Sequence, residues 1–368
     1  MILLYLSPVP WDSIAQRPHF FVKSILDNHD ADKIYWINPI PSRLPKLSDV
    51  RRLFFKLEPK SFSVPKKLSI IDPKHFLPIE PLPKLFKFLN YFAIKSILEK
   101  IDLLVSTHTS KGIILVIGKP SILALILLQR YQFHITIADI MDDFPYFFNG
   151  ISRKSMMNMT YKLMGKVDCV LFSSYCLEKK YSDYTHAYKV ILNATKSISH
   201  KEKYNKSINK IIYGYIGSIN KWFDWDFILK LAYKFPDREI WIIGPAYVSI
   251  PTLPPNIIIY PAVEHDKIPK YLNQFSYGLI PFKINELTNS VDPVKYYEYI
   301  AYHIPVISTE FGEMKNRIKN GYACSLEEHF EGKIPILENS VSWEERFPKQ
   351  FLTTLTKLDF KIKKRDKN

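Results

Sequence analysis

The chain has 368 residues, of which 47% are hydrophobic and 24% charged. This predicts about two globular domains and excludes a disordered chain or a disulfide scaffold. The three cysteines, Cys169, Cys176 and Cys324, lack zinc-site spacing, which indicates a reducing compartment and no structural metal. The net charge is +15, and residues 1–200 hold 27 basic but only 16 acidic side chains, which indicates an anionic partner: nucleic acid, acidic lipid or a phosphorylated substrate.

No segment of the sequence is expected to cross a membrane. Residues 1–6 are apolar, but they are few and lack the charged start of a signal peptide. The most apolar stretch, residues 112–128, is interrupted by Lys119 and Pro120, and it falls short of the roughly 18 uninterrupted apolar residues that a membrane helix needs. We therefore expect a cytoplasmic protein, with peripheral contact to the inner face of the cell membrane left open.

Short β-rich runs alternate with helical patterns through the first half of the chain. The predicted strands are residues 2–6, 33–38, 103–106, 114–117, 135–140 and 169–172. Predicted helices between them include residues 16–26, 85–98 and 121–129. Residues 39–83, rich in proline, lysine and phenylalanine, are expected to form a long excursion from the sheet. This alternation predicts a parallel sheet with helices on both faces.

The same alternation recurs in the second half. The predicted strands are residues 211–216, 239–243, 256–260, 277–281 and 305–308, and the predicted helices are 224–235, 266–275, 293–302 and 343–358. A lysine-rich polar stretch, residues 197–210, separates the halves. We therefore predict an α/β protein with two Rossmann-like domains, 1–200 and 201–342, followed by residues 343–368. The default ligand site is the cleft between the domains.

Several polar side chains follow predicted strands of the first domain, where a parallel sheet presents its ligands. Asp142 and Asp143 could bind the hydroxyls of a ligand, or one could act as a base; alternatively they cap a turn. Lys119 also follows a predicted strand. Arg17, just before Pro18 at a predicted helix start, could hold a ligand phosphate or be a structural cap, and Lys119 is ambiguous in the same way. His108 is expected to be a satisfied loop histidine.

Residues 83–100 form a basic amphipathic pattern. Lys84, Lys87, Tyr91 and Lys95 share one helical face, flanked by Phe88, and the opposite face carries Leu85, Leu89, Phe92 and Ala93. Lysines mixed with aromatic residues suit an anionic membrane surface. A surface helix packed on the sheet by its apolar face explains the same pattern, and both interpretations are compatible.

A glycine turn opens the second domain. Gly214 and Gly217 follow a predicted strand and precede a helix, and such a turn lets the backbone approach a phosphate closely. Lys221 follows it; the alternative is a tight turn with a solvated lysine. Asp224 and Asp226 imitate a metal-binding Asp-x-Asp pair, but Asp224 is expected to be the N-cap of the next helix.

The most informative segment is residues 277–309. A helix is predicted to start at Asp292 and Pro293, with Asp292 as N-cap, so its free N–H groups would form an anion site. Lys295 and Glu298 share a face of that helix and suit a diphosphate and the paired hydroxyls of a ribose. The alternative is an ordinary buried helix with a surface Lys295–Glu298 ion pair.

As a set, these motifs resemble GT-B glycosyltransferases, specifically the family 4 members of bacterial surface-polysaccharide synthesis. The Pro-x-Lys-x-x-Glu-Tyr run with the Pro-Val-Ile strand after it is similar to their nucleotide-sugar site. Further similarities are SPVPWDSIAQRPHFF (residues 7–21), ADIMDDFPYF (138–147), YGYIGSINKWFDWDFI (213–228) and WIIGP (241–245). The resemblance covers most of residues 1–310. It departs at Ser290, where many members carry a second glutamate, and Glu286 is a candidate substitute.

The resemblance implies that the second domain binds a UDP, dTDP or GDP sugar and the first binds a glycan acceptor, which the basic first half suggests is lipid-linked. It implies donor contacts from Gly217, Lys221, Ser290, Lys295 and Glu298, retention of configuration, and no cofactor or metal. Residues 343–358 are expected to form a helix that crosses back to the first domain, before a basic tail.

Three other functions were weighed. A degenerate GT-B protein could bind nucleotide or glycan without turnover, which Ser290 favours. A nucleic-acid module has no recognised motif here, so no nucleic-acid partner is expected. An epimerase needs a Gly-x-Gly-x-x-Gly turn after the first strand, and this chain lacks it.

Overall fold

The computed structural model describes residues 1–13, 15–41, 64–108, 111–197, 210–352 and 361–362, which form two compact units. Of these residues, those up to Leu192 and those from Phe347 onward belong to the first unit, and Asn193–Arg346 belong to the second. The sequence placed the junction near residue 200 and the return at residue 343. Most of the lysine-rich stretch and of the basic tail, and residues 42–63 of the predicted excursion, lie outside the described residues.

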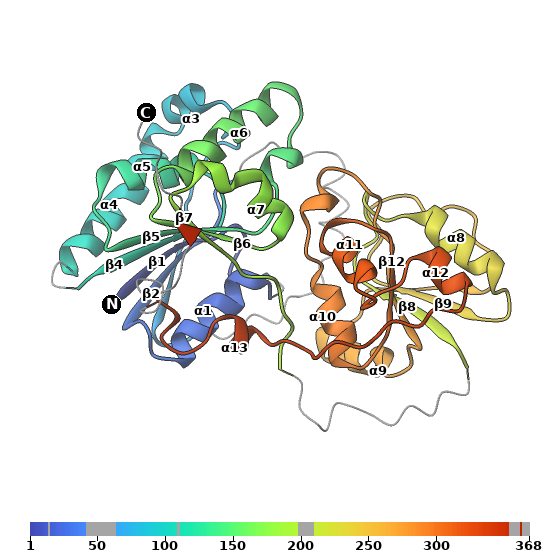
Figure 1. Cartoon of the computed structure of the whole chain (residues 1–368). Coiled ribbons are helices and arrows are strands. Elements are labelled where there is room, and N and C mark those ends of the chain that lie inside the picture. Colours follow the sequence, from blue (N-terminus) through green and yellow to red (C-terminus); the bar gives the residue numbers. More distant parts are fainter. Residues whose placement is uncertain (14, 42–63, 109–110, 198–209, 353–360, 363–368) are drawn as a thin grey trace. The chain divides into compact units, whose positions relative to one another are not determined.

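An eight-stranded sheet carries the described part of the first unit, in the order β13-β7-β6-β5-β4-β1-β2-β3. All neighbours are parallel except β13, which pairs antiparallel with β7. Every residue of β1 and β4 is buried, because helices cover both faces of the sheet (Figure 1). The strands are β1 (Ile2–Leu6), β2 (Lys33–Ile37), β3 (Leu68–Ile71), β4 (Ile113–Ile117), β5 (Ile135–Ile140), β6 (Cys169–Phe172), β7 (Ala187–Val190) and β13 (Lys361–Ile362).

The helices of the first unit follow the predicted alternation with two departures. They are α1 (Arg17–Asp27), α3 (Pro83–Leu89), α4 (Tyr91–Thr107), α5 (Ile122–Arg130), α6 (Gly150–Met164) and α7 (Tyr175–Tyr181), with short 3-10 turns at Phe144–Phe147 and Ser182–Tyr184. The predicted strand at 103–106 is wrong, because these residues form the last turn of α4, whose buried face is Ile97, Ile101 and Leu104 at helical spacing.

The second departure concerns the apolar face predicted for residues 85–98. Two helices form there instead of one, and Phe86 is the buried residue of α3. Leu85, Leu89 and Phe92 are exposed, so they do not pack on the sheet as the second interpretation expected.

The second unit contains a five-stranded parallel sheet in the order β10-β9-β8-β11-β12. Its strands are β8 (Ile212–Ile216), β9 (Glu239–Ile243), β10 (Ile257–Tyr260), β11 (Tyr277–Ile280) and β12 (Val306–Ser308). Its helices are α8 (Trp225–Lys234), α9 (Ile268–Leu272), α10 (Val294–Ala301), α11 (Gly312–Lys319), α12 (Leu326–Phe330) and α13 (Trp343–Arg346), with 3-10 turns at His265–Lys267 and Thr288–Ser290. Two parallel α/β sheets confirm the predicted fold class.

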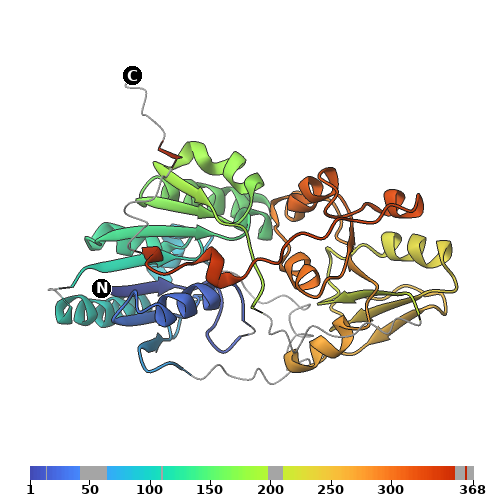
Figure 2. The same ribbon diagram turned by 60° about the horizontal axis from the view of Figure 1, so that its bottom comes forward.

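After α13 the chain rejoins the first unit. Figure 2 shows the chain running back along the first unit after α13. The Phe347 ring lies 5.0 Å from that of Phe21 in α1, and the Ser24 hydroxyl donates to the Phe347 carbonyl. The predicted single helix over 343–358 is wrong: α13 ends at Arg346, because Pro348 cannot donate the backbone hydrogen bond that would continue it. Residues 353–358 of that prediction lie outside the described residues.

Candidate functional site

The donor-side candidate lies where the second sheet reverses its strand order. β8 is flanked by β9, the next strand in the chain, and by β11, which comes later. The crevice at the carboxyl ends of such neighbouring strands is the usual ligand position in open α/β sheets. Here the turn after β8 pairs with the chain after β11: Phe223 bridges Phe282, and the Lys283 amide donates to the Trp222 carbonyl over 2.7 Å.

Two glycines form the floor of this site. Gly217 has φ +154° and donates its amide to the Ile243 carbonyl over 2.9 Å. Gly244, with φ +144°, lies so close that a Cβ there would be 2.2 Å from the Gly217 carbonyl oxygen. The two turns therefore pack backbone against backbone, and the turn after β8 is left bare of side chains, as a phosphate-binding turn requires.

Lys295 of α10 lies directly on Gly217. A Cβ built on Gly217 would lie 2.4 Å from Cε and 2.7 Å from Nζ of Lys295, and Nζ is 5.7 Å from the centre of the Tyr215 ring. The side chain is half-buried, and it makes no hydrogen bond or ion pair with any described residue. Burial lowers the pKa of Lys295, while the nearby Glu298 carboxylate opposes the shift. The result is a partly desolvated cation that makes no hydrogen bond or ion pair within the part of the chain that the structure describes.

Glu298 lies one turn further along α10 and is also half-buried. Its carboxylate has no hydrogen-bond or ion-pair partner among the described residues. In particular, Lys295 and Glu298 form no salt bridge within 4.0 Å, so the surface ion pair of the alternative interpretation is not formed. Both groups remain available to a ligand.

The start of α10 is fixed differently from the prediction. Asp292 is not the N-cap; Pro293 occupies that position, and the helix begins at Val294. Asp292 is only 2% exposed, and its carboxylate pairs with the Arg317 guanidinium at 2.8 Å and accepts from the Tyr297 hydroxyl at 2.9 Å. The distant partner Arg317, which local sequence statistics cannot reveal, captures the carboxylate. A buried ion pair thus anchors the helix that carries Lys295 and Glu298.

The other predicted donor residues lie around this centre. Lys221 is exposed, and its ammonium has no partner among the described residues. Ser290 is 2% exposed, and its hydroxyl donates to the Glu286 carbonyl at 3.5 Å, whereas the Glu286 side chain is exposed. Ser290 thus faces main chain, and Glu286 is the accessible carboxylate in this loop.

Asp224 is the N-cap of α8, as predicted. Its carboxylate accepts from the amides of Asp226 at 3.0 Å and Phe227 at 3.3 Å. Within the described ranges, no group of three or more His, Cys, Asp or Glu side chains is placed to hold a metal ion.

In the first unit, the two adjacent aspartates differ sharply. Asp143 is 1% exposed and accepts from Lys180 Nζ and the Tyr181 hydroxyl, each at 2.5 Å. Asp142 is half-buried, and its carboxylate makes no hydrogen bond with a described residue. Burial, with a smaller contribution from Asp143, raises the pKa of Asp142 to about 6. Asp143 is thus committed to the fold, whereas Asp142 is the available acid or base.

Arg17 is also committed to the fold. It is 4% exposed, and its guanidinium forms an ion pair with Asp139 of β5 at 2.9 Å and donates to the Ile191 carbonyl at 2.7 Å. This position matches the structural alternative for Arg17, although the partner is a buried carboxylate rather than a helix end.

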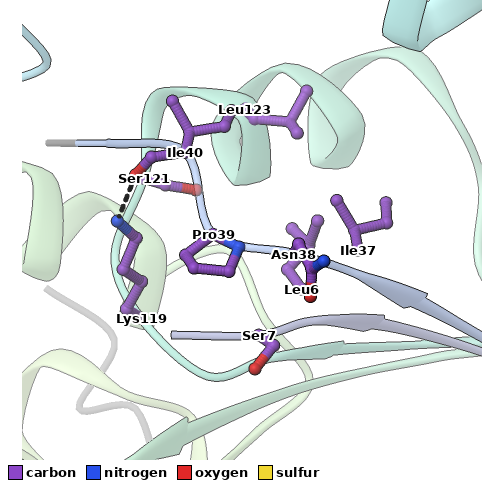
Figure 3. Close-up of a pocket in the computed structure, with 9 residues that line it drawn as sticks. All are labelled: Leu6, Ser7, Ile37, Asn38, Pro39, Ile40, Lys119, Ser121 and Leu123. Atoms are coloured by element: carbon purple, nitrogen blue, oxygen red, sulfur yellow. Dashed lines mark hydrogen bonds between the residues drawn. The ribbon is translucent and has the colours of Figure 1, made fainter. Parts of the chain in front are cut away.

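A small pocket opens at the carboxyl ends of β1, β2 and β4 (Figure 3). Lys119 lies at its edge, donating to the Ile40 carbonyl at 2.9 Å and lying 3.6 Å from the buried Glu80 carboxylate. Ser7, Asn38 and Ser121 supply the other polar side chains of its lining. The first sheet reverses its strand order beside β1, so this pocket occupies the position where such sheets bind ligands.

Three structural partners were missed by sequence reasoning: Gly244, Asp139 and Arg317. Gly244 stands in the WIIGP motif, whose glycine directly after a strand was an available signal. Asp139 and Arg317 had none, because their partners lie far away in the chain.

The comparisons with known proteins agree with this architecture. No family model matches the chain. TuaH of Bacillus subtilis (strain 168), whose name describes a teichuronic acid biosynthesis glycosyltransferase, is 28% identical over 132 residues; the match spans 34% of this chain and 32% of TuaH. The chain therefore matches about a third of the length of this curated relative.

Solved structures match over almost the whole chain. HepE from Anabaena, solved with UDP-glucose, has a TM-score of 0.59 at 11% identity and covers 97% of this chain and 100% of its own. Sucrose-phosphate synthase from Thermosynechococcus elongatus has a TM-score of 0.60 at 10% identity, covering 88% and 85%. The galactosyltransferase WaaB of the lipopolysaccharide outer core has a TM-score of 0.57 at 10% identity, covering 90% and 88%. The chain has the GT-B glycosyltransferase fold, which confirms the resemblance at the level of fold.

Proposed function

We propose that this protein is a glycosyltransferase that moves a sugar from a nucleotide-sugar donor to a glycan acceptor during bacterial surface-polysaccharide synthesis. The observation that carries the proposal is the unpaired, half-buried ammonium of Lys295 on the bare backbone of Gly217. A desolvated cation beside a glycine turn suits a diphosphate. The TuaH similarity supports the polysaccharide context.

In the proposed reaction, Lys295 acts on the leaving group. The bond between the sugar's anomeric carbon and the phosphate oxygen breaks, and the acceptor hydroxyl oxygen bonds to that carbon on the same face. Because the new bond forms on the face that the phosphate leaves, configuration is retained. The hydroxyl proton passes to the departing phosphate oxygen, so no separate base is needed, and the proposal includes no metal. Negative charge grows on the diphosphate, so Lys295 stabilises the transition state more than the ground state. Glu298 accepts hydrogen bonds from the ribose hydroxyls.

The acceptor belongs to the first unit in this proposal. Asp142 is the available carboxylate there, and it orients the acceptor hydroxyl by accepting its hydrogen bond. The excess of basic residues in the first half of the chain fits an acceptor linked to a lipid diphosphate.

Donor binding by single-site variants tests the proposal. HepE was solved with UDP-glucose, so UDP and its sugars come first, then those of dTDP and GDP. A ligand at a hundredfold excess over Kd should stabilise the protein by roughly 2.7 kcal/mol in a thermal-shift assay. Lys295→Ala should lower kcat strongly and also raise the donor Kd, Glu298→Ala should chiefly raise the donor Kd, and the exposed control Lys315→Ala should change neither kcat nor Kd. A crystal structure with the nucleoside diphosphate far from Lys295 would contradict the site.

One observation favours a second function, a GT-B protein that binds nucleotide or glycan without turnover. Ser290 replaces a family glutamate, and its buried hydroxyl faces the main chain. If nucleotide binds at Lys295 but no donor and acceptor pair releases nucleoside diphosphate, this second function holds. Glu286→Ala tests whether Glu286 takes the place of the family glutamate that Ser290 replaces; if it does, this variant should lose turnover.

A further inference from the structure

α3 and α4 expose an unusual mixture of side chains at the periphery of the first unit (Figure 1). Phe88 is 77% exposed and Phe92 is 81% exposed. We call the following set the α3–α4 surface, all of whose members are exposed: Lys84, Leu85, Lys87, Phe88, Leu89, Tyr91, Phe92 and Lys95. Isolated exposed apolar residues are common in proteins, but a cluster of this kind marks a binding surface.

The fold holds these aromatic side chains outward. Asn90, which is 1% exposed, separates the two helices, and its side chain accepts from the Leu77 amide at 2.6 Å and donates to the Leu77 carbonyl at 3.3 Å. Phe86 on one side of this junction and Ile97 on the other take the buried positions. Phe88 and Phe92 thus lie on the opposite, exposed side of the two helices.

The charge around these aromatic residues is predominantly positive. Residues 81–98 contain three lysines and no aspartate or glutamate. Lys84 and Lys87 have no ion-pair partner among the described residues, and Lys95 reaches only Glu99, at 4.0 Å. The neighbouring Glu80 is 0% exposed and accepts from the Ile122 amide, so it does not neutralise the surface.

We propose that the α3–α4 surface docks the protein on an anionic lipid bilayer. Phe88 and Phe92 enter the boundary between headgroups and acyl chains, and the lysines pair with lipid phosphates. Lys84 and Lys87, which have no acidic partner among the described residues, lie beside exposed aromatic side chains, and this combination matches the acidic, apolar interface that such a bilayer presents over its whole area. Among the described residues, no helix is long and apolar enough to cross a membrane. The proposal deepens the proposed function by locating the contact that brings the enzyme to a lipid-linked acceptor.

Sedimentation with vesicles tests the surface without any need for turnover. The full chain should pellet with vesicles of equal parts phosphatidylglycerol and phosphatidylcholine, and much less with phosphatidylcholine alone or in high salt. Phe88→Ser with Phe92→Ser should abolish pelleting. Each of Lys84→Gln and Lys87→Gln should weaken it about fivefold, the loss expected for one basic residue near an anionic surface. The matched control is Lys230→Gln with Tyr233→Ser on α8, two exposed residues of the second unit.

The remaining outcomes either support or overturn the proposal. Phe92→Trp should show blue-shifted fluorescence, quenched by brominated lipid, which supports insertion even if the serine variant folds poorly. Equal loss in the α8 control, or equal binding to neutral and anionic vesicles, overturns it. The proposal is also overturned if the protein does not bind vesicles but forms a dimer that the serine variant dissociates. A second copy of the chain would then be the partner of the α3–α4 surface. UDP binding is measured in parallel, so loss of membrane contact is distinguished from failure of the proposed function.

Discussion

Replacing Gly217 with alanine tests the contact on which the donor site depends. The added methyl would lie 2.4 Å from Cε and 2.7 Å from Nζ of Lys295, so one of the two groups must move. The end of a lysine side chain is the softer partner, so the ammonium should be displaced from the turn. We predict that Gly217→Ala reproduces the donor-binding defect of Lys295→Ala without touching the lysine.

The magnitude follows from the interaction that is lost. A hydrogen bond to a charged group is worth about 1.5–3 kcal/mol, so the donor Kd should rise roughly 10- to 150-fold. The φ of +154° adds backbone strain of about 1–3 kcal/mol, which lowers stability instead. Gly332→Ala separates the two effects, because Gly332 has φ +88° with no atom within 4 Å of an added Cβ. It should lower the melting temperature and leave the donor Kd unchanged.

A double-mutant cycle read by titration calorimetry with UDP decides the matter. In the Lys295→Ala background the methyl at position 217 has space, so Gly217→Ala should cost little further affinity. If the two effects simply multiply, the alanine disturbs the phosphate turn independently of Lys295. Unchanged affinity in Gly217→Ala alone would refute the reasoning.

Four further predictions concern charge. Donor affinity should fall as pH rises through the lowered pKa of Lys295, because the ammonium then loses its proton, and calorimetry on Lys295→Arg should show no such fall. Asp142→Asn should remove an acid limb near pH 6 from the pH profile of acceptor kcat/KM. Between pH 3.8 and about 6, Asp142 is protonated more often in the native state than in the unfolded state, so ionisation of Asp142 lowers the stability of the protein as pH rises. Asp142→Asn should therefore raise the free energy of unfolding in urea at pH 7 by roughly 1–2 kcal/mol. Arg17→Ala leaves the buried Asp139 carboxylate without its guanidinium partner, and it should lower the free energy of unfolding by about 3–5 kcal/mol in the same assay. Unchanged stability with a raised acceptor KM would contradict this structural role.

Strands were predictable where apolar runs ended at turn residues. Residues 135–140 and 239–243 match β5 and β9 because their β-branched side chains are buried between two layers of helices. Residues 103–106 have the same local composition, but they continue a helical repeat that begins at Ile97. Among the strands that were missed, β3, Leu68–Ile71, lies inside the stretch 39–83 that was expected to leave the sheet, and β7, Ala187–Val190, is a four-residue strand near the edge of the sheet whose apolar run is interrupted by Lys189.

In the candidate site too, local sequence patterns predicted some features, and others depended on contacts between distant parts of the chain. Lys295 and Glu298 could be predicted as a pair because residues three positions apart on a helix share a face. The contact of Lys295 with Gly217 could not, because the order of β8 and β11 in the sheet brings them together. Asp292 shows the limit of local rules: its N-cap preference competes with a buried ion pair to Arg317, and the pair wins because it also neutralises an enclosed guanidinium.

The return of the chain after α13 has a consequence for how the protein is made. The second unit is complete once Arg346 has been synthesised, but the first unit lacks the phenylalanines that cover Phe21. On the ribosome, the domain that is translated first therefore finishes last, reversing the usual N-to-C order. Until Phe347 and Phe351 have been synthesised, the apolar surface of α1 around Phe21 stays uncovered.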